Sequence, residues 1–138
     1  MMRAVWTEDR VTFPTRYIAA EITDMRMRPL PLPIPIWIGG SSDAAIARAL
    51  RHDGWHGSRC TPEQAAVMVQ RLREIRPEPE FMISLRTSFD GKDDAELRAR
   101  LGAYAAAGVQ HVLIEPTDRE IADWLRSVER IAKAGQGV

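Results

Sequence analysis

The sequence predicts an α/β fold of four consecutive βα units, preceded by an N-terminal excursion. Two observations lead to this prediction. After residue 34, short apolar runs alternate with longer segments of helical periodicity, which indicates a parallel sheet with crossover helices. Capping residues stand where these helices should begin, and glycines stand where they should end. We therefore divide the chain into residues 1–34 and a βα domain of residues 35–138.

Residues 1–34 are expected to form a helix, short strands and a proline-rich connector. The segment MMRAVWTE has helical character, and VTFPTRYIAAEI predicts a small hairpin or edge strands, with Pro14 limiting regularity. Prolines at positions 29, 31, 33 and 35 force extended backbone. Such a stretch could bind an aromatic-lined groove. Because a core strand follows at once, a stiff connector is the favoured interpretation.

The βα domain reads as four strands, each followed by a helix. Strands are expected over residues 34–39, 54–58, 80–89 and 109–115, and helices over residues 42–53, 62–75, 94–107 and 118–134. The strands are nearly continuous apolar runs, which predicts burial on both faces of the sheet. Two architectures satisfy this order of elements: a small open doubly wound sheet, or half of an eight-stranded barrel.

Helix boundaries carry their own signals. Capping boxes are expected at residues 61–64 and 117–120, and an aspartate variant of the same device at residues 93–96. Gly54 and Gly108 fall where left-handed C-caps belong. The apolar residues of the last two helices share one face each, which we expect to be buried. These faces are Leu97, Leu101, Tyr104 and Ala105 in one helix, and Ile121, Trp124, Leu125, Val128 and Ile131 in the other.

Composition excludes several classes of protein. The 138 residues are 45% hydrophobic, and 19 basic side chains balance 19 acidic ones, so we expect no general binding of nucleic acid or of anionic membranes. No stretch approaches the about 20 apolar residues of a membrane-spanning helix, and the amino terminus does not resemble a signal peptide. Cys60 is the only cysteine, which rules out an intrachain disulfide. We expect a cytoplasmic protein.

The junction PIWIGGSS, residues 35–42, is the most specific feature. Ligands of parallel α/β folds collect at the carboxyl ends of strands, where Gly39 and Gly40 would let a ligand approach the backbone. The next helix would direct free N–H groups toward that point, so a phosphate is the natural ligand. The alternative is a tight strand-to-helix turn capped by Ser41 or Ser42. The junction is neither a Rossmann fingerprint nor a P-loop.

The second junction, WHGSRCTPEQ, adds polar groups at the end of the next strand. Arg59 could complete an anion site through charge-assisted hydrogen bonds, with Ser58 beside it. His56 is interpreted as an ordinary loop histidine, because no carboxylate stands at a sequence spacing that would indicate an acid/base partner. Cys60 next to an arginine could have a lowered pKa, but without an assignable histidine partner it is interpreted as inert.

The remaining junctions give no catalytic assignment. Their charged residues are Arg86, Asp90, Lys92, Glu115 and Asp118, and the acidic ones are interpreted mainly as helix-start residues. His111 lies inside a strand pattern and is expected to be a packed core histidine. No histidines and carboxylates have the spacing of metal ligands, so no metal is expected.

Three stretches together resemble one family: MRAVWTEDRVTF, MRPLPLPIPIWIGGSSDAAIARALRHDGW and LRARLGAYAAAGVQHVLIEP. They are similar to the carboxyl-terminal half of the luciferase-like monooxygenase superfamily, in the branch of oxidoreductases that use the deazaflavin coenzyme F420 rather than FMN. The similarity covers essentially the whole chain. The proline-led strand into IWIGGSS, followed by a helix and DGW, is specific as a unit.

The resemblance implies four βα units of a (β/α)8 barrel of the TIM type, with a cofactor across the carboxyl ends of the strands. It implies that the backbone of Gly39 and Gly40, with Ile38 and Ser41, holds the cofactor's phosphate. The loop of residues 56–61 would lie beside that phosphate, which makes Ser58 and Arg59 candidate helpers. The expected cofactor is F420, with FMN as the alternative, and the expected substrate is a small organic molecule.

The strands that hold the flavin ring and the substrate in this family precede the part that the chain resembles. We therefore expect an F420- or FMN-dependent oxidoreductase if an amino-terminal half complements the chain, and we assign no catalytic residue. A homodimer, or a complementary half-barrel chain, would close the two open sheet edges. The alternatives are a non-catalytic half-barrel binding or partner module, and a truncated remnant of such an enzyme.

Overall fold

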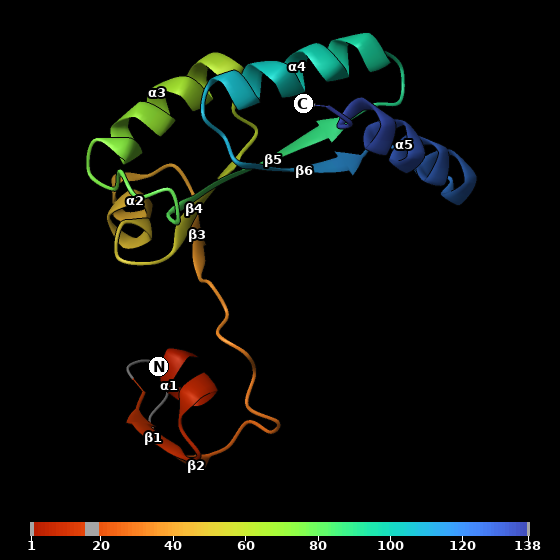
Figure 1. Ribbon diagram of the computed structural model, residues 1–138. Coiled ribbons are helices and arrows are strands. Elements are labelled where there is room, and N and C mark those ends of the chain that lie inside the picture. The colour runs from red at the N-terminus through yellow and green to blue at the C-terminus, as the bar shows by residue number, and fades with distance from the viewer. Residues whose placement is uncertain (1, 16–19, 138) are drawn as a thin grey trace. The chain divides into compact units, whose positions relative to one another are not determined.

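A computed structural model describes residues 2–15 and 20–137 of the chain (Figure 1). The chain forms two compact units, Met1–Pro35 and Ile36–Val138, and we describe each by itself. The first contains helix α1 (Met2–Thr7) and an antiparallel pair, β1 (Val11–Pro14) with β2 (Glu21–Met25). The sequence predicted a helix here and a small hairpin or edge strands. Residues 16–19 of the expected hairpin lie outside the described residues.

The second unit alternates strands and helices throughout. In chain order its elements are β3 (Trp37–Gly39), α2 (Asp43–Ala49), β4 (Gly54–Ser58), α3 (Pro62–Arg73), β5 (Met82–Phe89), α4 (Asp94–Ala106), β6 (His111–Pro116) and α5 (Ile121–Ala134). The four strands form one parallel sheet in the order β3-β4-β5-β6. A doubly wound sheet reverses its strand order at a switch point, whereas a barrel continues in sequence. The unit is therefore four consecutive βα units of a (β/α)8-type barrel.

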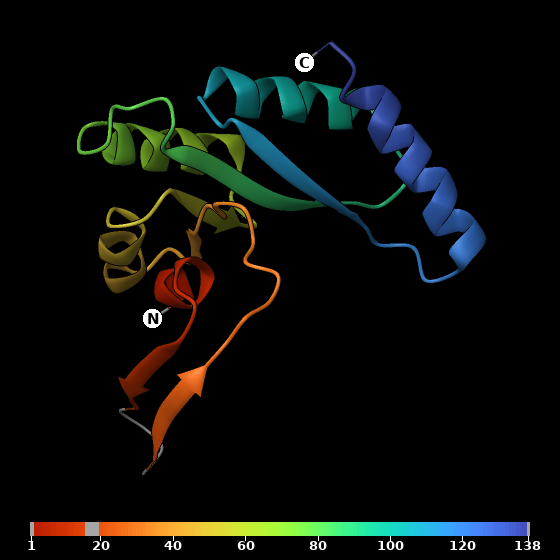
Figure 2. The same ribbon diagram turned by 60° about the horizontal axis from the view of Figure 1, so that its bottom comes forward.

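Helices cover one face of this sheet. Figure 2 shows α3 and α4 running along the same side of it. The side chains of Trp55, Ile83 and Leu85 point to that side and are fully buried against helix residues such as Leu72. Within the described part of Ile36–Val138, no helix covers the opposite face. That face corresponds to the interior of a closed barrel, and we call it the inner face.

The inner face corrects the expectation of strands buried on both sides. Every second residue of a strand points to the same face, and on this face most side chains are polar or at least partly exposed. They are Trp37, His56, Ser58, Met82, Ser84, Arg86, Ser88, His111, Leu113 and Glu115. Within these mainly apolar strands, polar residues therefore recur at every second position, most clearly in β5.

Helix starts follow the expected chemistry in three of four cases. Ser42 caps α2 by accepting a hydrogen bond from the N–H of Ala45, and Asp93 caps α4 in the same manner. The complete capping box of residues 61–64 is present at α3, with Pro62 as the first helical residue. The box expected at residues 117–120 is wrong. Helix α5 begins at Ile121 after a glutamate that makes no side-chain cap.

The two glycines expected to end helices have different roles. Gly108 has a φ of +90° just after α4, which confirms the left-handed position. Gly54 is not a C-cap, because α2 has already ended at Ala49 and Gly54 begins β4. A Cβ on Gly54 would lie 2.5 Å from the carbonyl oxygen of Met82, so this glycine allows close contact between neighbouring strands.

The predicted apolar faces of the last two helices also differ in outcome. In α4, Leu97, Leu101 and Tyr104 are buried as expected, although Ala105 is exposed. The apolar face of α5 is not buried in this unit, since Ile121 is 78% exposed and Leu125 is 52% exposed. In the described part of the chain, no helix is both long enough and apolar enough to cross a membrane.

Candidate functional site

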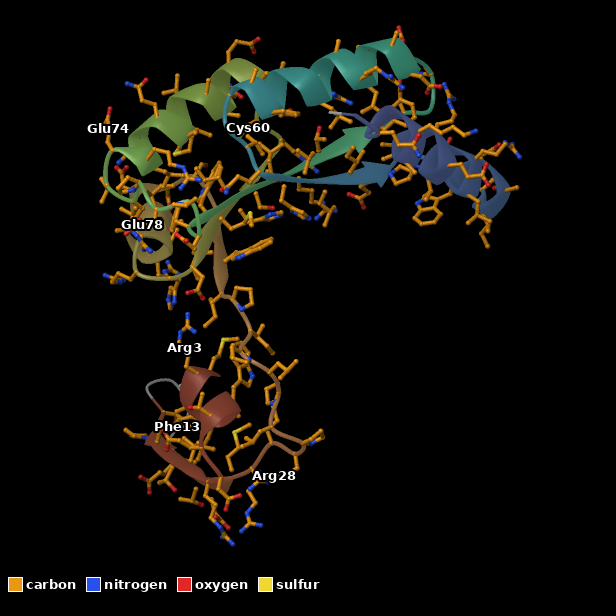
Figure 3. All side chains as sticks on the ribbon, viewed as in Figure 1. Arg3, Phe13, Arg28, Cys60, Glu74 and Glu78 are labelled. Carbon is orange, nitrogen blue, oxygen red and sulfur yellow. The ribbon has the colours of Figure 1, made fainter. Side chains whose placement is uncertain are left out.

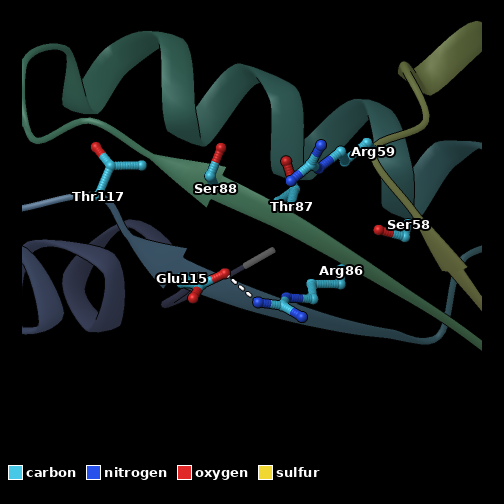
Figure 4. Close-up of a pocket in the computed structure, with 7 residues that line it drawn as sticks. All are labelled: Ser58, Arg59, Arg86, Thr87, Ser88, Glu115 and Thr117. Carbon is cyan, nitrogen blue, oxygen red and sulfur yellow. Dashed lines mark hydrogen bonds and ion pairs between the residues drawn. The ribbon is translucent and has the colours of Figure 1, made fainter.

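A polar cavity lies at the carboxyl ends of β4, β5 and β6. It has a volume of about 530 Å³, and Figure 4 shows its lining residues along the three strand ends: Ser58, Arg59, Arg86, Thr87, Ser88, Glu115 and Thr117. The lining therefore contains four hydroxyl groups, two guanidinium groups and one carboxylate. Guanidinium and hydroxyl donors suit an anionic oxygen ligand such as a phosphate.

The charges in this cavity leave one cation without a counterion. Arg86 on β5 pairs with Glu115 on β6, as the dashed line in Figure 4 shows. Among the described residues, the guanidinium of Arg59 makes neither an ion pair nor a hydrogen bond. The cavity therefore carries a net positive charge, and its unpaired cation is the arginine that the sequence singled out.

The backbone of Arg59 has a positive φ angle and is held by a hydrogen bond to the neighbouring strand. Its φ is +55°, in the left-handed region that residues other than glycine seldom adopt. Its N–H donates to the carbonyl oxygen of Arg86 at 3.0 Å, which adds one hydrogen bond beyond the β4–β5 ladder. Strained backbone of this kind persists only where the surrounding structure holds it in place, and it clusters at functional sites such as ligand clamps.

The IGGSS junction lies at the carboxyl end of β3, beside β4. The indole N–H of Trp55 donates to the carbonyl oxygen of Gly40 at 2.8 Å, and the N–H of Gly40 points to the carbonyl oxygen of His56 at a longer 3.4 Å. Gly39 and Ser41 are exposed. Gly39 is open, since an added Cβ would meet only the His56 carbonyl oxygen, at 3.7 Å. Backbone with this much free space can be approached closely by a ligand.

The structure unites only part of the site expected from the sequence. Ser58 and Arg59 share the cavity, whereas residues 38–41 form no part of its lining. The side chain of Ile38 packs against the buried core, so only its backbone could face a ligand. The hydroxyl of Ser42 is occupied as the cap of α2, which leaves the Ser41 hydroxyl as the one available at this turn.

The other junction residues have structural partners. Asp90 accepts a hydrogen bond from the N–H of Lys92, and Asp118 accepts one from the hydroxyl of Ser127. The thiol of Cys60 donates to the carbonyl oxygen of Ser58 at 3.6 Å. Figure 3 labels this cysteine at the start of α3, with Glu74 at the other end of the helix. The described residues contain no cluster that could hold a metal ion.

Both histidines of the barrel strands differ from their expected roles. His111 is not a core histidine, because it is exposed on the inner face with its ring 5.4 Å from that of Trp37, centroid to centroid. His56 is not a loop residue, since it lies within β4 and is half-buried. Burial lowers the pKa of His56, and the nearby His111 and Arg86 lower it further. These effects favour the neutral form of the His56 ring.

Sequence reasoning missed several polar residues of this region, chiefly Ser84, Thr87, Ser88 and Thr117. A signal was present in the strand MISLRTSF, where Ser84, Arg86 and Ser88 recur at every second position. That period places all three on one face of a strand. The surrounding isoleucine, leucine and phenylalanine made the segment read as a wholly apolar strand.

The sequence pattern of the family described as luciferase-like monooxygenase matches residues 1–136. The chain belongs to this family. One similar solved structure is an F420-dependent secondary alcohol dehydrogenase in complex with an F420-acetone adduct, with a TM-score of 0.70 and 12% sequence identity. The likeness covers 94% of this chain but 58% of that one, so the present luciferase-like chain spans little more than half of its structural neighbour. Among curated protein sequences, none matches.

Proposed function

We propose that this luciferase-like chain binds the phosphate of a flavin or deazaflavin cofactor at the carboxyl ends of β3 and β4, as part of an oxidoreductase. The observation that carries the proposal is the unpaired guanidinium of Arg59, set among hydroxyl groups at the strand ends where parallel α/β folds bind ligands. Membership of the luciferase-like family supports the cofactor class.

The residues present fit a phosphate. Arg59 and Ser58 supply side-chain donors, and the backbone at Gly39, Gly40 and Ser41 is exposed, with open space beside Gly39 where no Cβ stands in the way. Ile38 contributes backbone only. When bound, the cofactor supplies hydride transfer, and the protein supplies position and electrostatics. In this proposal, the inner face of the sheet receives the part of the cofactor or substrate beyond the phosphate.

We propose F420 as the cofactor, with FMN as the alternative. The similar solved structure binds F420, which supports the first choice for a chain of this fold. The substrate class is a small organic molecule. The open inner face and the exposed apolar face of α5 also support assembly with a second copy or with a complementary half-barrel chain. Turnover by the purified chain alone would rule out a non-catalytic binding module.

The experiment is a fluorescence titration of the purified chain with F420 and, separately, with FMN. Arg59→Ala should raise the Kd about tenfold or more, because a hydrogen bond to a charged group contributes about 1.5–3 kcal/mol. Gly39→Val should also weaken binding, since its side chain would occupy open space at the site. Arg48→Ala, which removes an exposed arginine on α2, is the matched control and should leave the Kd unchanged.

Equal losses of affinity in all three variants, or no loss in any, would contradict this placement of the phosphate. Circular dichroism of each variant should show unchanged helix content, so that a weaker Kd reports on the site and not on folding.

A further inference from the structure

Three side chains form a continuous hydrogen-bonded chain across the inner face. His56, Ser84 and His111 occupy one row of the sheet, directly opposite each other on β4, β5 and β6. The hydroxyl oxygen of Ser84 lies 2.9 Å from Nδ1 of His56 and 2.8 Å from Nδ1 of His111. The serine is fully buried between the two rings. Two imidazoles are therefore joined through one hydroxyl group.

The chemistry of a hydroxyl group makes this chain directional. Ser84 has a single hydroxyl hydrogen, and in the arrangement that uses this hydrogen within the chain it donates to one Nδ1 and accepts from the other. The ring that receives the hydrogen bond must carry its own proton on Nε2. The ring that donates must carry a proton on Nδ1, which leaves its Nε2 as a free base when the ring is neutral. The two neutral imidazoles are thereby held in opposite tautomers.

Both outer nitrogens are available to a ligand. In the described part of the chain, Nε2 of His56 and Nε2 of His111 make no hydrogen bond; the His56 nitrogen is not a buried atom, and His111 is an exposed residue. Trp37 on β3 borders the His111 ring at an interplanar angle of 59°. A ligand on the inner face would therefore meet one nitrogen that accepts a proton and one that donates a proton.

The surroundings of His56 disfavour a positive charge on its ring. The charged or titratable groups that face His56 are His111 on β6 and Arg86 on β5, and both oppose a positive charge on its ring. Arg86 is in turn paired with Glu115, which holds its guanidinium toward β6.

We propose that His56, Ser84 and His111 form a proton relay across the inner face, with an acid at one end and a base at the other. The relay serves a group that exchanges a proton, such as the hydroxyl or carbonyl oxygen of a small organic ligand. It goes beyond the phosphate site and stands independently of it, since none of the three residues lines the polar cavity.

The step balances without another reactant. Starting with His56 as the Nδ1–H tautomer, a proton binds its Nε2, and the Nδ1–H bond breaks as that proton passes to the Ser84 oxygen. The original hydroxyl hydrogen moves to Nδ1 of His111, and the proton on Nε2 of His111 leaves. One proton enters, one leaves, each ring changes tautomer, and no net charge is gained.

The test is nitrogen NMR of the histidine rings in the full chain at about pH 8, above the ordinary histidine pKa. The proposal predicts that one of His56 and His111 is the Nδ1–H tautomer and the other the Nε2–H tautomer. His52, the third histidine, serves as an internal reference. Two rings in the same tautomer would overturn the relay, and this measurement needs no variant to fold.

Ser84→Ala supplies the second arm. Removing the hydroxyl should abolish the opposite assignment, because each ring then adopts the tautomer that its own surroundings favour. Ser88→Ala, on the same face of β5 but outside the chain, should leave both tautomers as in the wild type. Opposite tautomers that persist in Ser84→Ala would show that the serine does not couple the rings. Cofactor affinity is not read in either arm, so failure of the phosphate proposal leaves this result unaffected.

Discussion

Gly40 and Gly39 are adjacent, yet the structure predicts opposite responses to an added methyl group. Gly40 has a φ of +113°, a conformation that L side chains rarely adopt, and an added Cβ would lie 3.0 Å from the Cβ of Ala45. That alanine is buried in α2 and cannot move aside easily. At Gly39 an added Cβ would meet only a carbonyl oxygen at an ordinary 3.7 Å.

The expected magnitudes differ accordingly. Backbone held in a sparsely populated region costs about 1–3 kcal/mol. Gly40→Ala should therefore lower the free energy of unfolding by about 1–3 kcal/mol. Gly39→Ala should change it by no more than about 0.5 kcal/mol, the range of surface substitutions without a special role. This contrast is also why Gly39→Val, and not a substitution at Gly40, is the better probe of the cofactor site.

The assay is urea denaturation followed by tryptophan fluorescence, since the chain has four tryptophans. The midpoint should fall for Gly40→Ala at an unchanged m-value, and it should stay near that of the wild type for Gly39→Ala. Equal midpoints for the two variants would refute the reasoning, because neither the positive φ nor the close contact with α2 would then matter.

Three further predictions concern other parts of the second unit. The pKa of His56 is lower in the folded chain than in the unfolded chain, so the unfolded chain binds more protons as the pH falls through the ordinary histidine pKa of about 6.5. Stability that is present above that pH is therefore lost below it. In His56→Gln, the urea midpoint should fall less steeply with decreasing pH than in the wild type. Tyr104→Phe removes a 2.6 Å hydrogen bond to the Cys60 carbonyl oxygen and should lower the free energy of unfolding by about 0.5–1.5 kcal/mol, whereas an unchanged thermal midpoint would contradict it. Leu97→Ala in the core should lower the free energy of unfolding by about 2–5 kcal/mol, while Ile121→Ser on the exposed face of α5 should lower it by less than about 0.5 kcal/mol, because Ile121 is 78% exposed. Similar losses would show that this face is covered.

Local signals predicted the local features well. The capping box of residues 61–64 and the left-handed position of Gly108 depend on a few neighbouring residues, and both are present. The order of strands and helices was likewise readable, because hydrophobic periodicity reports directly on regular structure.

Features with a tertiary cause could not be read in the same way. Gly54 follows a helix and so resembles a C-cap, but its lack of a side chain is needed for contact with Met82 on the next strand. His111 sits among apolar residues, yet it points to the uncovered face, where it meets Ser84 and Trp37. Which face of a strand is covered depends on where the helices pack, and the sequence of a single strand does not show this.

In the candidate site, too, some residues were predictable from the local sequence and others only from the arrangement of the strands. Arg59 and Ser58 were identifiable because they follow a strand end directly. Thr117 and Glu115 join them only because β6 lies beside β5, which is a property of the sheet. The spacing of residues along the chain likewise did not predict that residues 38–41 lie outside the lining of the cavity.

The most direct test of the central claim, that a cofactor phosphate binds at the carboxyl ends of β3 and β4, is amide NMR mapping during a titration with F420, with FMN in parallel. We expect saturable shifts of the amide signals of Gly40, Ser41 and Arg59, with little change at Gly54 and Met82, which lie at the opposite ends of their strands. Saturable binding that leaves the first three signals unmoved, or that shifts chiefly the last two, would contradict it.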